Sequence, residues 1–190
     1  EPSEITKLMN SRKGIIRLLM FALAVMMCGG SVEAQELNAR KHGSIREQMQ
    51  QSNFFNDKNA AQIRELLDYA SQFKGTRYRR GSSSPKGFDC SGFTSYVFKK
   101  FGYSLNRSSS SQMSNGDPVA KNDLKPGDLV FFNGRRSSGK RVGHVGIVTE
   151  VNTNGTFKFI HSTNGKGVVE SQSTEPYYNR RYVGARRVID

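Results

Sequence analysis

Residues 143–161 read GHVGIVTEVNTNGTFKFIH and predict a β-hairpin. Two runs rich in β-branched and aromatic residues, 143–149 and 156–161, lie on either side of the pair Asn154-Gly155. Such runs are typical of strands, and Asn-Gly is a strong signal for a hairpin turn. The two runs are therefore expected to be adjacent antiparallel strands.

Further strands and two helices are predicted around this hairpin. Runs of strand-forming residues cover 128–132, 167–170 and 182–189. Upstream, apolar residues at three- and four-residue steps predict a helix over 59–74, and a second helix is expected to begin at or near Cys90. Helices followed by strands indicate an α+β domain with an antiparallel sheet of about five to six strands.

The N-terminal segment has the pattern of an export signal. Basic residues precede an uninterrupted apolar run over 18–27, and small residues follow it. We therefore expect residues 1–34 to be a secretory signal peptide with Met9 as its natural start, a short amphipathic or buried helix being the alternative. Residues 35–58 are polar and predict a linker or weak helix, and residues 59–190 are expected to form one folded domain.

The chain has two cysteines, Cys28 and Cys90. Cys28 follows the apolar run directly, where a lipid anchor would attach, but Met26 and Met27 do not fit the small residues of a lipoprotein site. Cleavage after Ala34 would leave Cys90 as the sole cysteine of an exported protein in the periplasm or cell envelope. An unpaired thiol in such a protein indicates a reactive role.

Basic residues outnumber acidic ones, with 29 Lys and Arg against 16 Asp and Glu. This charge favours contact with a polyanion, and for an exported protein an anionic cell-wall polymer or membrane surface fits better than nucleic acid. A solvated basic surface that aids solubility is equally open. The basic clusters lie within residues 77–80, 135–141, 180–181 and 186–187.

Cys90 lies in Gly87-Phe-Asp-Cys-Ser-Gly92, at the predicted junction of a loop and a helix. Free amides and the helix dipole at such a junction favour negative charge, so we expect them to lower the pKa of the thiol. The same amides can receive the oxyanion formed when a thiolate attacks a carbonyl. A small buried core cysteine is the alternative reading of this position alone.

The predicted hairpin supplies a base for this nucleophile. His144 begins its first strand and His161 ends its second, so both lie at the open end of the hairpin, where the register decides whether they touch. The small neighbours Gly143 and Gly146 leave room for His144 to approach the cysteine helix, and His161 is placed to orient it. A zinc ion on Cys90 and the two histidines is disfavoured, since no CxxC or HxxxH pair and no fourth ligand accompany them.

The segment from Tyr78 to Val183 resembles the NlpC/p60 family of cell-wall cysteine peptidases, which have a papain-like fold. Four motifs carry the resemblance in the family's order. They are Phe88-Asp-Cys-Ser-Gly92, Leu124-Lys-Pro-Gly-Asp-Leu-Val-Phe-Phe132, Gly143-His-Val-Gly-Ile147 and Ile160-His161. The resemblance implies a domain in which the nucleophile, at a helix N-terminus, packs on the antiparallel sheet.

The resemblance also implies roles for individual residues. Cys90 would be the nucleophile, His144 the general base and acid, and His161 the third polar residue of the relay. Tyr78 matches a tyrosine that lines the active site in the family.

The two neighbours of Cys90 are expected to bind substrate. Asp89 and Ser91 match positions that contact the substrate near its amino group in some family members. Capping of the helix that begins at Cys90 is the alternative role for Asp89.

The resemblance implies a secreted cysteine endopeptidase that needs no cofactor and acts as a monomer on peptidoglycan peptides. In the family the bond cut often joins D-glutamate, through its side-chain carboxyl, to a diamino acid, and other members cut the D-alanine–diaminopimelate cross-link. An amidase or acyltransferase on another substrate, or a wall-binding module with an inert site, remains an alternative. A nucleic-acid binder is disfavoured by the export signal and by the lack of clustered exposed aromatics on a basic strand face.

Overall fold

The computed structural model describes residues 46–134 and 141–190. The predicted signal peptide with Met9, the lipid-anchor site Cys28 and most of the basic cluster at 135–141 lie outside the described residues. Contacts between Cα atoms divide the chain into two compact units, Glu1–Phe55 and Asn56–Asp190. The second unit holds every residue for which the sequence predicts a catalytic or binding role.

Residues 46–71 are helical, so the helix predicted over 59–74 continues into the part of 35–58 that the structure describes. In the second unit, Leu66 and Ala70 of this helix are fully buried in the core. No helix within the described ranges is long and apolar enough to cross a membrane.

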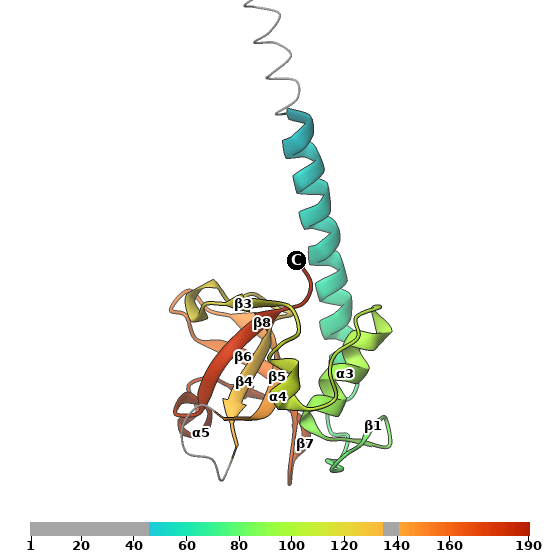
Figure 1. Cartoon of the computed structure of the whole chain (residues 1–190), viewed down its shortest axis with the longest axis vertical. Coiled ribbons are helices and arrows are strands. Elements are labelled where there is room, and N and C mark those ends of the chain that lie inside the picture. The colour runs from blue at the N-terminus through green and yellow to red at the C-terminus, as the bar shows by residue number, and fades with distance from the viewer. Residues whose placement is uncertain (1–45, 135–140) are drawn as a thin grey trace, which may run out of the picture. The chain divides into compact units, whose positions relative to one another are not determined.

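The other elements of the second unit are short helices and strands (Figure 1). The predicted strands correspond to β4 to β8, whereas β1, β2 and β3 have only two or three residues, too few for a detectable pattern. The bounds are β1 Ser83–Ser84, β2 Gly87–Phe88, α3 Cys90–Lys100, α4 Ser109–Gln112, β3 Asp117–Val119, the 3-10 helix η1 Lys121–Asp123, β4 Leu129–Asn133, β5 Val142–Val151, β6 Phe157–Thr163, β7 Gly167–Gln172, α5 Pro176–Asn179 and β8 Tyr182–Arg187.

Six strands form one sheet in the order β3-β8-β4-β5-β6-β7, and all neighbours are antiparallel. The α+β class and the predicted sheet are thereby confirmed. The hairpin of β5 and β6 forms as expected: Gly155 adopts a φ of 77° in its turn, where its amide donates to the carbonyl of Asn152 at 2.9 Å. Ile147 pairs with Ile160 in the ladder, which fixes the register of the hairpin.

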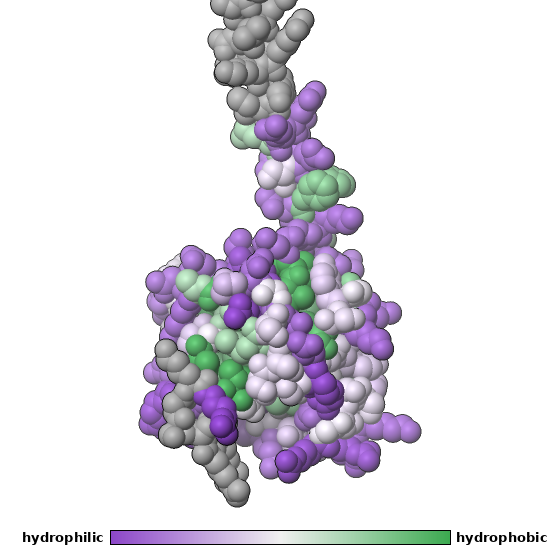
Figure 2. Space-filling view, in the orientation of Figure 1, coloured by the Kyte–Doolittle hydropathy of each residue, from purple (hydrophilic) through white to green (hydrophobic). Residues whose placement is uncertain are grey.

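The two faces of the sheet bury different clusters of apolar side chains. Along β4, Phe131 packs with the α3 residues Phe93 and Val97, whereas Phe132 belongs to a second cluster that includes Phe159. This alternation follows from the two-residue period of a strand. Helix α3 therefore covers one face of the sheet, beside β5 and β6 (Figure 1). Hydrophilic residues occupy much of the periphery of this unit in the view of Figure 2.

The N-terminus of α3 is held by polar contacts on both sides. Asp89 caps the helix by accepting a hydrogen bond from the amide of Gly92 at 2.6 Å, and its own amide donates to the carbonyl of Ser82 at 2.9 Å. The buried hydroxyl of Ser162 in β6 donates to the carbonyl of Phe88 at 2.8 Å. These contacts fix the position of the first turn of α3 relative to the sheet.

We predict that Gly92→Ala destabilises the fold. A Cβ atom at this position would overlap the backbone carbonyl of Ser82 and lie 2.8 Å from a carboxylate oxygen of Asp89. Overpacking of this kind costs about 1–3 kcal/mol, which urea unfolding of the full chain followed by circular dichroism measures. The control is Gly184→Ala, whose Cβ would meet only the methyl group of Met113 at an ordinary 3.6 Å. Equal stability of the two variants would contradict this account.

Candidate active site

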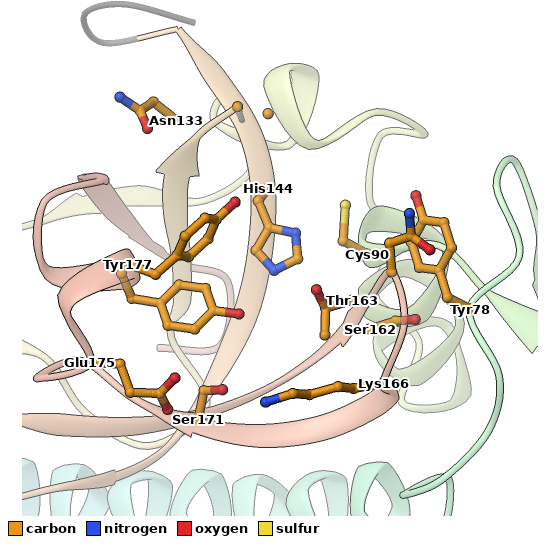
Figure 3. Close-up of a pocket in the computed structure, with 14 residues that line it drawn as sticks. Tyr78, Cys90, Asn133, His144, Ser162, Thr163, Lys166, Ser171, Glu175 and Tyr177 are labelled. Atoms are coloured by element: carbon orange, nitrogen blue, oxygen red, sulfur yellow. The ribbon is translucent and has the colours of Figure 1, made fainter. Parts of the chain in front are cut away.

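A pocket of about 500 Å³ has both Cys90 and His144 in its wall (Figure 3). Cys90 enters from the first turn of α3 and His144 from the start of β5. In Figure 3 the imidazole of His144 points a ring nitrogen toward the side of the pocket that holds the sulfur of Cys90. The wall is completed by Tyr78, Asn133, Gly134, Gly143, Ser162, Thr163, Asn164, Lys166, Ser171, Glu175, Tyr177 and Tyr178.

The two histidines lie near one another, as the hairpin predicted, and the observed register brings them into direct contact. His144 Nε2 and His161 Nδ1 are 2.9 Å apart. A Cβ added at Gly146 would lie 3.1 Å from the Cβ of His161 and 2.7 Å from the ring of Phe159. Gly146 therefore lies opposite His161. Because Gly146 has no side chain, the ring of His144, two residues earlier on the same face, can contact the ring of His161.

Tyr178 extends this pair to a third ring. His161 is fully buried, and its Nε2 is 3.4 Å from the hydroxyl of Tyr178. The ring of Tyr178 also stacks on His144 at 6.3 Å between centroids and 26° between planes. Sequence reasoning missed Tyr178, because α5 has only four residues and gives no periodic signal.

Both imidazoles are neutral at pH 7. Burial lowers the pKa of His144 to about 4. Burial also lowers the pKa of His161, and the positive charges of a protonated His144 and of Lys166 lower it further. With Nε2 of His144 bonded to His161, Nδ1 is the nitrogen left to accept a proton from Cys90.

The expectation of a lowered thiol pKa is wrong. Burial and then the negative charge of Asp89 raise the pKa of Cys90 above its ordinary value of 9.0. Three amides stabilise the thiolate and lower the pKa of Cys90, those of Val145, Ser91 and Cys90 itself. Their effect is smaller than the rise in pKa that burial of the thiol causes. The resting site therefore pairs a thiol with a neutral imidazole.

Both neighbours of Cys90 form hydrogen bonds within the protein, and their predicted contact with the substrate stays a prediction. Asp89 caps α3 and forms an ion pair with Arg107 at 2.8 Å. Ser91 is buried, and its hydroxyl lies 3.1 Å from Nη1 of Arg107. Tyr78 lines the pocket, and burial first, then Cys90 and Asp89, raise the pKa of its phenol. The sequence did not predict the ion pair of Arg107 with Asp89, because no pattern in the serine-rich run after Arg107 indicates a contact with Asp89.

The site offers no metal-binding cluster within residues 46–134 and 141–190: no three or more His, Cys, Asp and Glu side chains gather there. Cys90 is a free thiol. The nitrogen atoms by which His144 and His161 face one another are occupied by their mutual hydrogen bond. The arrangement suits proton transfer between a thiol and an imidazole that a second imidazole orients.

Curated relatives share the sequence of this domain. The chain is 40% identical over 125 residues to "Murein DD-endopeptidase MepS/Murein LD-carboxypeptidase" of Escherichia coli strain K12, which covers 65% of this chain and 62% of the relative. It is 36% identical, with the same two coverages, to "Probable endopeptidase NlpC homolog" of Haemophilus influenzae. The alignments thus span about three fifths of the length of these relatives.

Solved structures share the fold. An NlpC/P60 family protein from Bacillus cereus superimposes with a TM-score of 0.61 at 33% identity, over 67% of this chain and 40% of that protein. The family model described as "NlpC/P60 family" matches residues 75–187, more than half of the chain. The matched segment contains the thiol, both histidines and the sheet that carries them. The chain belongs to the NlpC/P60 family.

Proposed function

We propose that this protein is a secreted cysteine endopeptidase that hydrolyses amide bonds in peptidoglycan stem peptides or cross-links. The observation that carries the proposal is the pocket shared by Cys90 and His144, with His144 bonded to His161 at 2.9 Å. The relatives named as a murein endopeptidase and a probable endopeptidase support the substrate class. Export to the cell envelope rests on the signal-like pattern of residues 1–34.

The first step moves a proton from Cys90 to His144. Nδ1 of His144 accepts the thiol proton as Sγ forms a bond to the carbonyl carbon of the substrate. His144 then carries a positive charge, while its Nε2–H donates to Nδ1 of His161. His161 in turn has Tyr178 as the partner of its second nitrogen, which holds the tautomer that this step requires.

The carbonyl oxygen becomes negative in this step and needs hydrogen-bond donors. The amides of Gly92 and Phe93 are already bonded to Asp89, one to its carboxylate and one to its carbonyl. The amides of Cys90 and Ser91, which face the sulfur, remain at the N-terminus of α3. We assign the oxyanion to these two amides, where the helix dipole adds to their effect.

The second half of the reaction returns the proton. His144 donates it to the leaving nitrogen, the carbon–nitrogen bond breaks, and the acyl group remains on Cys90 as a thioester. Water then gives a proton to His144 and attacks the thioester, which releases the acid and restores the thiol. The leaving amine must therefore lie on the side of Cys90 where His144 lines the pocket.

The basic clusters are only partly available for an anionic wall polymer. Arg187 binds the buried carboxylate of Asp128 through two hydrogen bonds of 2.9 Å, and Arg181 donates to the carbonyl of Gly134 at 2.9 Å. These arginines stabilise the fold, and their hydrogen bonds within the protein make their guanidinium groups less available to an external anion. Attraction to the wall then depends on the exposed remainder, which includes Arg79 and Arg80.

We expect Cys90→Ala to abolish hydrolysis without unfolding the protein, since it removes only the nucleophilic sulfur. Mass spectrometry of peptidoglycan and soluble muropeptides after incubation with the full chain measures this and identifies the bond from the fragment masses. The matched control is Cys28→Ala, which removes the other cysteine and should cleave like the wild type. New fragments from Cys90→Ala would exclude Cys90 as nucleophile. Wall binding by both forms with no fragments from the wild type would favour the inert binding module.

The raised pKa of Cys90 predicts slow alkylation at neutral pH. A thiol whose folded pKa exceeds 9.0 is uncharged at pH 7, so its reaction with iodoacetamide should accelerate until the pH passes that value. Hydrolysis itself needs His144 in its neutral form. Because the pKa of His144 is about 4, the hydrolysis rate should be retained above that pH and lost as the pH falls below it. Mass spectrometry of the Cys90 peptide gives the alkylation rate, and a plateau already reached near pH 6 would indicate a preformed thiolate–imidazolium pair instead.

Tyr178→Phe should lower kcat about two- to tenfold and leave KM unchanged. The change removes one neutral hydrogen bond to His161, worth about 0.5–1.5 kcal/mol, and keeps the ring that stacks on His144. It also removes the hydrogen bonds of the hydroxyl with Ser171 and Thr163. The control is Tyr182→Phe, because the buried hydroxyl of Tyr182 has no hydrogen-bond partner within the described residues and touches neither histidine. A loss of kcat in Tyr182→Phe as large as in Tyr178→Phe would show that the effect does not pass through His161.

A further inference from the structure

A second cavity, of about 550 Å³, adjoins the pocket that holds His144, and the two share Tyr78 and Cys90. The leaving amine lies on the His144 side, because His144 protonates it. The acyl part, which stays bonded to the sulfur, must then continue into the second cavity. The charges that line this cavity come from Arg80, Asp89 and Arg107.

The carboxylate of Asp89 is already saturated by hydrogen bonds from the protein. It accepts from the amides of Gly92 at 2.6 Å and Gly81 at 2.8 Å, and both of its oxygens bind Arg107, at 3.1 and 2.8 Å. The hydroxyl of Ser91 donates a fifth bond at 3.3 Å. A carboxylate has about four lone-pair sites, so none is left for a substrate ammonium group unless Arg107 moves.

The positive charge of the cavity is in excess. Two guanidinium groups, Arg80 and Arg107, face one carboxylate, Asp89, which leaves a formal charge of +1. Arg80 is exposed, and its guanidinium forms no hydrogen bond or ion pair with residues 46–134 and 141–190. Its charge nonetheless acts on the phenol of Tyr78, at the border of the two cavities.

We propose that this cavity is a carboxylate subsite, in which Arg80, beside the Arg107–Asp89 pair, binds a carboxylate on the acyl half of the substrate next to the scissile bond. The proposal rests on the peptidase function above and names the chemistry that it selects. A guanidinium can bind a carboxylate through two parallel hydrogen bonds. The same cavity disfavours an acyl half that carries a free amino group, because its charge would meet two arginines and no available carboxylate.

The test uses a soluble peptidoglycan peptide in two forms, with the acyl-half carboxyl nearest the scissile amide either free or amidated. For the full wild-type chain we expect kcat/KM to be about fivefold higher with the free carboxylate, the upper range for an exposed ion pair. The ratio should fall towards one in Arg80→Gln and as ionic strength rises. The matched control is Arg79→Gln, which removes an equal exposed charge one residue away that does not line the cavity, and which should keep the wild-type ratio.

Arg107→Gln provides a second, independent variant. Loss of the guanidinium leaves Arg80 and Asp89 in the cavity wall, a formal charge of zero. The preference for the free carboxylate should therefore fall towards one in this variant. Three results would overturn the carboxylate subsite. The first is equal cleavage of both forms by the wild type, and the second is an equal loss of preference in Arg79→Gln and Arg80→Gln. The third is faster cleavage of a peptide with a free amino group on its acyl half than of the acetylated peptide. Absence of cleavage of either form by folded wild type would instead overturn the peptidase function, and the subsite with it.

Discussion

The candidate active site depends on the attachment of the first turn of α3 to the end of the β5–β6 hairpin. The buried hydroxyl of Ser162 donates to the carbonyl of Phe88, and this bond ties the residue after His161 to the loop just before Cys90. Phe88 itself is fully buried between α3 and the sheet. The proposed nucleophile and base, Cys90 and His144, lie far apart in the sequence and are brought to one pocket by this junction, as efficient proton transfer requires.

The relay beyond His144 follows from which face of the sheet each residue occupies. His144 and His161 lie on the face that carries Phe132, Phe159 and Tyr178, whereas α3 packs on the opposite face. Cys90 lines the same pocket as His144 because α3 begins near the first residues of β5, where the amide of Val145 bonds its sulfur. His161 is therefore buried in an aromatic cluster, whereas His144 packs beside it and still lines the pocket that holds the thiol.

Asp89 links the start of helix α3 to the electrostatics of the site. Burial alone would raise its pKa, but hydrogen bonds from Arg107 and from the amides of Gly92 and Gly81 lower it, so it stays ionised. It caps helix α3, and its charge raises the pKa of Cys90. On the side of the second cavity, the charge of Asp89 is neutralised by its ion pair with Arg107.

The sequence by itself determined the α+β class, the hairpin around Asn154-Gly155, the helix that begins at Cys90 and the proximity of His144 to His161, because these depend on local periodicity and on turn chemistry. It could not determine the raised pKa of Cys90, the contact of Tyr178 with His161, or the ion pair between Asp89 and Arg107. Those three depend on burial and on contacts between residues distant in the chain, quantities that only the packed tertiary structure sets.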